Sequence, residues 1–392
     1  MTDIYIVNGA RTAIGSFGGS LSSFRPAELG TMVMKEAIAR AGIQPTDVED
    51  VIVGSVVPTQ PKDAYVARMA AVNAGIPVES PAMGVNRLCG SGLQAVISVA
   101  QGIALGEHDI AVAAGTEVMS QAPRLLQNSR NGVKMGDLVL QDLMLGALQD
   151  PFEDIHMGVT AENVARQCQV SREDQDRTAV ESHRRAAAAI AGGYFKSQII
   201  PVEIKTRKGV TVFDTDEHVR PDASLESMAG LKPAFLKDGT VTAGNASGIN
   251  DGAAAVVLAS GKAVAEKGLK PMARILGWGH AGVEPSVMGL GPVRAVPVAL
   301  KRAGLTLDQM DVVEANEAFA AQTCAVASSL GFDMTKTNPN GSGISLGHPI
   351  GATGVILTVK MIYELQRIGG RYGLITMCIG GGQGIAMVVE RV

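Results

Sequence analysis

The sequence predicts an α/β protein that contains two copies of one α/β unit. Short runs rich in valine and isoleucine, each about as long as a buried strand, alternate with longer segments of helical period. A single offset of 262 residues brings helices, strands and glycine turns of the first part of the chain onto those near its end. Glycine occupies 47 of 392 positions without a collagen period, so many positions require a bare backbone.

The elements follow one another in an order typical of a covered sheet. Buried strands are expected at residues 3–7, 51–57, 110–114, 253–259, 312–313, 372–377 and 385–390. Helices are expected at residues 27–41, 66–74, 93–105, 160–168, 172–191, 297–303 and 355–368. Ser171 is expected to cap the helix that begins at Arg172.

The duplication defines the domain organisation. The offset places Gly92 on Gly354 and residues 110–114 on residues 372–376, in the same order along the chain. We expect a first unit at residues 1–118, completed by 250–270, and a second unit at 271–392. Residues 119–249 form an inserted loop domain, in which the basic clusters 182–185 and 205–208 are either ligand contacts or a solvated helix face.

Composition excludes several classes of protein. The net charge is -4, from 34 basic and 38 acidic residues, and gives no reason to expect nucleic acid or an anionic membrane as a partner. The first residues lack the pattern of a signal peptide, and no apolar run is expected to reach the ~20 residues of a membrane span. Cys89, Cys168, Cys324 and Cys378 form no CxxC pair, which predicts free thiols in a cytoplasmic protein rather than a zinc site or disulfides.

The first candidate nucleophile is Cys89, in the string NRLCGSGLQA at residues 86–95. It precedes an apolar helix, where free backbone N–H groups are expected to stabilise a thiolate or an oxyanion. The same string contains GxGxxA, with Glu117 further along, which is a weak dinucleotide-binding pattern and leaves a hydride-transfer enzyme as an alternative.

Three further positions carry chemistry. His348 opens the helix equivalent to the one after Cys89, and it can take the thiol proton. Cys378 ends a strand and is followed by three glycines whose N–H groups suit an anion hole. Asn316, in EANEAFA, can hold a water or a carbonyl oxygen.

At these strings the sequence resembles the thiolase family over essentially its whole length. NRLCGSG, NEAFA, GHPIGATG and CIGGGQG occur in the family's order and spacing. The resemblance implies a thiolase fold, with duplicated α/β units in a five-layer αβαβα arrangement and an inserted loop domain. It also implies acetyl-CoA C-acetyltransferase (β-ketothiolase) activity: a reversible, ping-pong Claisen condensation of acetyl-CoA with acetyl-CoA or a short acyl-CoA.

The resemblance assigns roles to these residues. Cys89 is the acylated nucleophile, His348 activates it, and Cys378 is the acid or base at Cα of the second substrate. Asn316 orients a water that forms one oxyanion hole with His348, and the N–H groups of Cys89 and Gly380 form the other. No metal or redox cofactor is expected, because coenzyme A thioesters are the substrates.

The inserted region is implied to bind coenzyme A. The expected contacts with the coenzyme, its pantetheine arm or the acyl group are His156, Met157, Arg220, Ser227, Phe235, Ser247, Met288 and Phe319. Arg220 also has an independent reason, because a guanidinium binds phosphate well.

Some properties stay open or rest on the family alone. GSGISLGHP, at Gly341 to Pro349, differs from the GGAIAIGHP of acetoacetyl-specific members and resembles more permissive β-ketothiolases. The alternatives are a decarboxylating ketoacyl synthase of the same fold, which needs no second thiol, and a silent acyl-CoA-binding protein. The family further implies a homotetramer and a place in fatty acid or polyhydroxyalkanoate metabolism.

Overall fold

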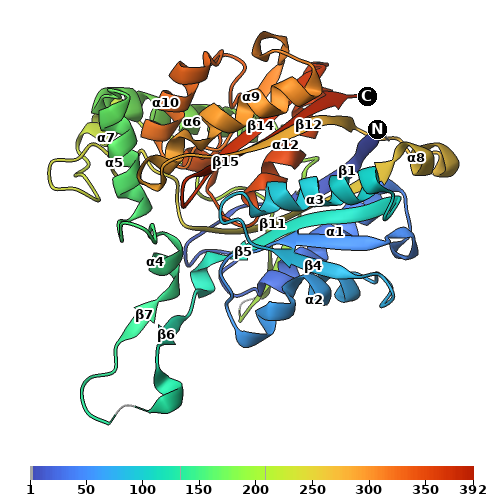
Figure 1. Ribbon diagram of the computed structural model, residues 1–392, viewed down its shortest axis with the longest axis horizontal. Coiled ribbons are helices and arrows are strands. Elements are labelled where there is room, and N and C mark those ends of the chain that lie inside the picture. The colour runs from blue at the N-terminus through green and yellow to red at the C-terminus, as the bar shows by residue number, and fades with distance from the viewer. Residues whose placement is uncertain (1–2, 133, 208) are drawn as a thin grey trace.

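A computed structural model describes residues 3–132, 134–207 and 209–392, and its centre is a large mixed sheet (Figure 1). Within the described residues the sheet has eleven strands, of which β2 (Gly15–Ser16) pairs with β11 and β8 (Ile199–Ile200) with β1. The other nine follow the order β4 (Ala82–Val85), β3 (Asp50–Gly54), β5 (Ile110–Val118), β11 (Asn250–Ser260), β1 (Ile4–Thr12), β12 (Ala273–Gly282), β15 (Gln383–Arg391), β14 (Tyr372–Ile379) and β13 (Val312–Ala315).

The sheet consists of two halves with the same topology. In the first half, β1, β11 and β5 are antiparallel neighbours and β5 runs parallel to β3. In the second half, β12, β15 and β14 are antiparallel neighbours and β14 runs parallel to β13. Only two residue pairs, Tyr5–Arg274 and Ile6–Ala273, join β1 to β12. The predicted duplication is confirmed.

The helices cover the two half-sheets in layers, as the edge-on view in Figure 1 shows. Helix α1 (Pro26–Ala41) packs on β1, β11 and β5, with α2 (Val66–Asn73) beside it. Helices α3 (Ser91–Leu105) and α12 (Thr353–Ile368) contact each other and lie between the halves. Helix α9 (Gly291–Ala303) covers β12 and β15, with α10 (Ala320–Leu330) alongside. The order is therefore helix, sheet, helix, sheet, helix, as expected.

The central helices approach each other through glycine. A Cβ atom at Gly354 would collide with the backbone of Leu93, and one at Gly92 would lie 2.9 Å from the backbone nitrogen of Val355. These two glycines are the pair that the 262-residue offset superposes. The crossing of α3 and α12 therefore requires glycine at both positions.

The stretch Leu88–Leu105 corrects one expectation from the sequence. In the part of the chain that the structure describes, it is the one helical segment long and apolar enough to cross a membrane, with a mean hydropathy of 1.5. An apolar run near membrane length therefore does exist. Its helix α3 packs against α12, β3 and β5, so this composition is that of a core helix.

The region between the halves carries the remaining elements. They are the hairpin β6 (Arg124–Leu126) and β7 (Leu140–Asp142), α4 (Leu143–Ala147), α5 (Met157–Gln167), α6 (Arg172–Ala191), the hairpin β9 (Val202–Thr206) and β10 (Gly209–Phe213), and α7 (Leu225–Ala229). Helix α8 (Gly261–Lys267) follows β11, and α11 (Gly343–Leu346) precedes α12. The Ser171 hydroxyl caps α6 by accepting the N–H of Asp174 at 3.1 Å, as expected. Helices α5 and α6 pack on α10 of the second half, whereas β8 pairs with β1 of the first half, so the region contacts both halves.

The basic cluster at residues 182–185 is not a plain solvated face. Ser182 and His183 are buried, and the Arg185 guanidinium donates to the backbone oxygen of Thr337 at 2.6 Å. Only Arg184 is exposed, and it pairs with Glu181 at 2.6 Å. In the second cluster, Lys208 lies outside the described residues. Domain boundaries at 118, 249 and 270 stay a prediction.

Candidate active site

A cavity of about 350 Å³ brings together residues from both halves of the sheet and from the inserted region. Cys89 reaches it from the turn before α3, and Gly380 from the residue after β14. His348 does not open α12 as expected, because it lies in the loop between α11 and α12, before Thr353 begins the helix. The rest of its lining is largely apolar. Of the predicted substrate contacts it contains His156, Met157, Phe235, Ser247, Met288 and Phe319.

Cys89 lies on a tight turn immediately before α3. Leu88 adopts a left-handed conformation, with φ of 45°. Its N–H donates to the Asn86 side chain at 3.0 Å, and the N–H of Arg87 donates to the Ser91 hydroxyl at 2.8 Å. These local bonds stabilise a conformation that a non-glycine residue adopts at a cost. They present the half-buried sulfur to the cavity.

The resting thiol of Cys89 is protonated. Burial raises its pKa to about 11, and the negative charge of Glu117 acts in the same direction. The backbone N–H groups of Gly380 and Cys89 itself are directed at the sulfur and oppose the shift without cancelling it. The expected stabilisation of a thiolate by backbone N–H groups is thus present, but desolvation of the sulfur outweighs it. The thiol needs a base.

His348 is a neutral base buried beside the cavity. Burial lowers its pKa to about 4, so the imidazole carries no charge near neutral pH. Its backbone N–H donates to the Asn250 side chain at 2.9 Å, and its Nδ1 lies 2.7 Å from the Thr353 hydroxyl. Both the main chain and the ring of His348 are thus held in place.

Cys378, the residue before the last of β14, is fully buried and close to Cys89. Burial and the neighbouring Cys89 both raise the pKa of the Cys378 thiol far above its ordinary value. A thiolate formed here would be a strong base. The site therefore holds two protonated thiols and one neutral imidazole.

Asn316 lies against His348 with a free oxygen. Its side-chain nitrogen is 3.5 Å from Nδ1 and 3.4 Å from Nε2 of the ring. Its Oδ1 is buried and has no protein partner among the described residues. Asn338 holds the preceding residue, Ala315, by bonds of 2.9 Å and 2.8 Å to its N–H and carbonyl groups. This unpartnered amide oxygen beside His348 can accept a hydrogen bond from the water that the family resemblance implies.

An aromatic wall closes the cavity opposite Cys89. The ring of His156 stacks on Phe235 with centroids 4.7 Å apart, and Phe235 meets Phe319 edge-on at 6.3 Å. The His156 Nδ1 accepts the N–H of Gly158 at 3.0 Å, which leaves its Nε2 as a donor. Met157 and Met288 are buried in the same cluster. Side chains of this kind suit a ligand with a narrow, mostly apolar chain.

Arg220 and Ser227 do not line the Cys89 cavity. Both are exposed and line a neighbouring pocket of about 170 Å³, together with His183 and His218. The two spaces share Ala243 and Ala246. The predicted coenzyme contacts therefore divide into an inner apolar group and an outer polar group.

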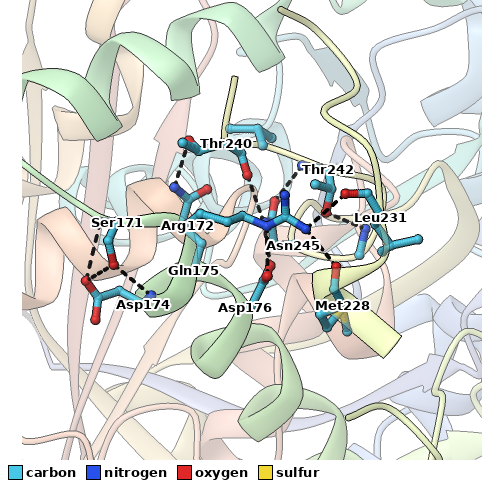
Figure 2. A network of polar contacts seen from close by, with 12 residues as sticks. Ser171, Arg172, Asp174, Gln175, Asp176, Met228, Leu231, Thr240, Thr242 and Asn245 are labelled. Carbon is cyan, nitrogen blue, oxygen red and sulfur yellow. Dashed lines mark hydrogen bonds and ion pairs between the residues drawn. The ribbon is translucent and has the colours of Figure 1, made fainter. Parts of the chain in front are cut away.

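A network of polar contacts holds the loop between these two spaces (Figure 2). Arg172, at the start of α6, donates to Asp176 at 2.7 Å and to the backbone oxygens of Met228 and Leu231. The side chain of Asn245 donates to Asp176 at 2.9 Å and accepts the N–H of Thr242 at 2.8 Å. Because Thr242 lines the inner cavity and Met228 the outer pocket, α6 fixes the wall that they share.

The sequence patterns missed the residues that orient the site. Thr353 and Asn250 hold His348, yet those patterns assign neither of them a role, although Thr353 lies within the string GHPIGATG. Glu117 is buried, and its carboxylate accepts the N–H groups of Val56, Val57 and Gly351. The dinucleotide alternative, in which Glu117 binds a ribose, is therefore wrong.

Other features of the described residues lie outside the chemistry. Cys168 caps the end of α5, and the Cys324 sulfur lies 3.1 Å from the hydroxyl of Thr178. Among residues 3–132, 134–207 and 209–392, no three His, Cys, Asp or Glu side chains gather as a metal site would require.

Comparisons with known proteins match this sequence to thiolases over nearly its whole length. Residues 4–262 match the model of the thiolase N-terminal domain, and residues 269–391 match that of the thiolase C-terminal domain. Beta-ketothiolase BktB of Cupriavidus necator is 59% identical over 391 residues, which covers 100% of this chain and 99% of that protein. Acetyl-CoA acetyltransferase of the same organism is 51% identical and covers 100% of both chains.

Solved structures confirm the predicted thiolase fold. Human mitochondrial 3-ketoacyl-CoA thiolase superposes with a TM-score of 0.98 at 44% identity, covering 100% of this chain and 99% of that one. Another structure of that human protein, in complex with CoA, gives 0.97 at 44% identity, with coverage of 100% and 98%. Bacillus anthracis acetyl-CoA acetyltransferase gives 0.98 at 45% identity, with coverage of 100% and 99%.

Proposed function

The chain belongs to the thiolase family and is an acyltransferase, and we propose that it acts as an acetyl-CoA acetyltransferase through an acyl-Cys89 intermediate. In the condensing direction, acetyl-CoA reacts with a second acetyl-CoA or a short acyl-CoA to give a β-ketoacyl-CoA and free coenzyme A. In the other direction, coenzyme A cleaves the β-ketoacyl-CoA. The observation that carries the proposal is one cavity holding the Cys89 thiol, the neutral His348 and the N–H of Gly380 beside the buried Cys378.

The first half-reaction transfers the acyl group to Cys89. His348 takes the thiol proton, and the thiolate attacks the thioester carbonyl. The N–H groups of Cys89 and Gly380 stabilise the resulting oxyanion, a role supported by their direction toward the sulfur. The carbon–sulfur bond to coenzyme A then breaks, and the departing sulfur receives the proton from His348.

The second half-reaction forms the carbon–carbon bond. His348, neutral again after coenzyme A leaves, takes the proton of the Cys378 thiol and later returns it to the released Cys89 sulfur. The Cys378 thiolate removes a proton from Cα of the second acetyl-CoA, and protonated His348 with a water on Asn316 stabilises the enolate oxygen. The enolate carbon attacks the acyl carbonyl on Cys89, and the bond to the Cys89 sulfur breaks. Proton transfer and hydrogen bonding supply every step, so we propose that no cofactor is needed beyond the coenzyme A substrates.

The substrate lies across both pockets in this proposal. The aromatic wall of His156 and Phe235, with Ser247, contacts the pantetheine arm, and Met157, Met288 and Phe319 border the acyl group. Arg220 and Ser227, in the outer pocket, contact the nucleotide end, where a guanidinium can pair with phosphate. A cavity of about 350 Å³ also suits short acyl chains better than long ones.

Assembly and location complete the proposal. Two surfaces support a homotetramer: the edge strand β4, with Met83 49% exposed, and the hairpin of β6 and β7, which protrudes in Figure 1. The hairpin region exposes Leu125, Met135, Leu138, Val139 and Leu140. Cys89 must stay reduced to react, so we place the enzyme in the cytoplasm. A role in fatty acid or polyhydroxyalkanoate metabolism stays a prediction.

A thiolysis assay with β-ketoacyl-CoA substrates from C4 to C8 tests this function. We expect cleavage to be fastest with the shortest chains and to require free coenzyme A. Binding of coenzyme A without cleavage of acetoacetyl-CoA would contradict the proposal. Activity with malonyl thioesters but not with acetyl-CoA would indicate a ketoacyl synthase instead.

A further inference from the structure

The ring of His348 has one close partner, the hydroxyl of Thr353. Its Nδ1 lies 2.7 Å from Thr353 Oγ1, a normal hydrogen-bond length. Thr353 is the first residue of α12, and its hydroxyl also lies 2.9 Å from the carbonyl oxygen of Pro349, one turn earlier. The hydroxyl therefore sits between a ring nitrogen and a carbonyl.

Both contacts are hydrogen bonds at the same time in only one arrangement. A carbonyl oxygen has no proton, so the Thr353 hydroxyl donates its single proton to Pro349, whose oxygen also accepts the backbone N–H groups of Ala352 and Thr353 at 2.9 Å. The oxygen of that hydroxyl can then only accept, so Nδ1 of His348 must carry a hydrogen. In a neutral imidazole this leaves Nε2 with the free lone pair.

We propose that Thr353 is a positioning residue that fixes His348 in the Nδ1–H tautomer, so that Nε2 is the atom that exchanges a proton with Cys89. The inference rests on the proposed function for its catalytic meaning. It adds the residue that determines which ring nitrogen of His348 carries the hydrogen.

Other neighbours of His348 do not make this selection. The Asn316 amide is nearly equidistant from the two ring nitrogens, at 3.5 and 3.4 Å, so it lies over the ring rather than along one lone pair. Asn250 bonds only the backbone N–H. The titratable groups around the pair are Glu117 on β5, Cys378 on β14, Asp251 on β11 and His156 before α5, and each of them keeps its own partners or is a neutral thiol.

The arrangement predicts a specific pH behaviour. When Nε2 takes the Cys89 proton as the sulfur attacks, the reacting forms are the neutral thiol and the neutral imidazole, so the rate of this general-base route does not depend on solution pH across the neutral range. Without the Thr353 hydroxyl, Nδ1–H loses its buried acceptor and the ring shifts toward the Nε2–H form, which cannot accept. Thiolate then forms only by loss of a proton to solvent, and its amount rises with pH.

The experiment measures alkylation of each cysteine by iodoacetamide between pH 6 and pH 9, with peptide mass spectrometry as the readout. The variants are Thr353→Val and Thr353→Ala, which remove the hydroxyl, and Thr353→Ser, which keeps it. Thr358→Val is the matched control, because Thr358 is buried on the same helix and donates to Gly354 in the same way at 2.8 Å without contacting His348. Alkylation of Cys168 serves as the reference within each chain.

We expect wild type, Thr353→Ser and Thr358→Val to alkylate Cys89 at rates within about twofold of one another and nearly independent of pH. In Thr353→Val and Thr353→Ala, Cys89 should be alkylated about tenfold more slowly at pH 7, and its rate should rise with pH. The loss is smaller than the roughly 10²–10⁴ contribution of a general base, because alkylation through the solvent-formed thiolate remains. A wild-type profile in both hydroxyl-free variants would overturn the inference. So would equal slowing in Thr353→Ser or Thr358→Val, or faster alkylation of buried Cys378, which would indicate a loosened fold.

This assay needs no substrate, so it separates the inference from the proposed function. Wild-type protein that fails to cleave acetoacetyl-CoA would contradict the function while the alkylation result still tests Thr353. Normal thiolysis in Thr353→Val, with an unchanged pH profile of kcat, would contradict the inference while leaving the function intact.

Discussion

The backbone N–H of Gly380 is directed at the sulfur of Cys89, and this contact joins the end of β14 to the start of α3. The two residues belong to different copies of the duplicated unit, so each copy supplies what the other lacks. One provides the nucleophile, and the other provides the base, the second thiol and the oxyanion donor. Neither half of the sheet could hold the site alone.

Cys378→Ala separates the two half-reactions. The variant should acylate Cys89 at close to the wild-type rate, because Cys378 has no part in that step. Condensation should fall by a factor of about 10² or more, the usual loss of an acid–base group. Acylation by quenched mass spectrometry and condensation by product formation measure the two effects. Cys324→Ala is the control, and parallel loss of both steps in Cys378→Ala would contradict the assignment.

The pH dependence of acylation follows from the shifted pKa values of His348 and Cys89. Since burial lowers the pKa of His348 to about 4, the neutral base persists as pH falls and is lost only near that value. Since burial raises the pKa of Cys89 to about 11, the thiol stays protonated until that pH. We expect the rate of Cys89 acylation to be flat between pH 5 and pH 9. An inflection near the ordinary histidine pKa of ~6.5 would show that the base is not held as described.

Gly354→Ala tests the contact between the central helices. The added methyl group would meet the backbone of Leu93, which cannot move aside as a side chain can. We expect the free energy of unfolding to fall by roughly 1–3 kcal/mol, with a loss of activity because Cys89 and His348 lie in the segments that lead into these helices. Urea unfolding measures the first effect. Gly146→Ala, where a Cβ meets no atom within 4 Å, should be near neutral.

Asn245→Ala tests the polar support of the substrate wall. It removes the acceptor of the Thr242 N–H and the donor to Asp176, so the loop between the two pockets should loosen. We expect the KM for coenzyme A to rise several-fold, with a smaller change in kcat, at a stability cost of about 1–3 kcal/mol for the unpaired N–H. Asp174→Ala removes the carboxylate that accepts the N–H and hydroxyl of Ser171 and that pairs with exposed Arg177, so it should lower stability and leave KM unchanged. Equal KM values in both variants would contradict this role.

The sequence predicted the parts of this architecture that repeat or that follow local chemistry. The 262-residue offset paired α3 with α12 and β5 with β14, and Ser171 marked the start of α6. Because Cys89 lies before α3 and His348 lies in the loop before the equivalent helix α12, their approach could be predicted from the repeat. The glycines at 92 and 354 follow the same logic, since a close crossing of two equivalent helices needs a small residue on each.

The remaining features depend on contacts between distant residues. Glu117 reaches Gly351, and Asn250 holds His348, through bonds that no local pattern encodes. The acidity of Cys89 could not be predicted either, because the helix N-terminus and the burial of the sulfur act in opposite directions and only the fold sets their balance. The family resemblance implied that Arg220 and Ser227 contact the coenzyme, but it did not reveal that they line a separate outer pocket.

The most direct test of the central claim is the site of acylation. The protein is mixed with acetyl-CoA, quenched in acid within seconds, digested and examined by peptide mass spectrometry. The account predicts one acetyl group, attached to Cys89, which disappears when coenzyme A is added before the quench and is absent in Cys89→Ala. An acetyl group on another residue, or turnover without any covalent intermediate, would contradict it.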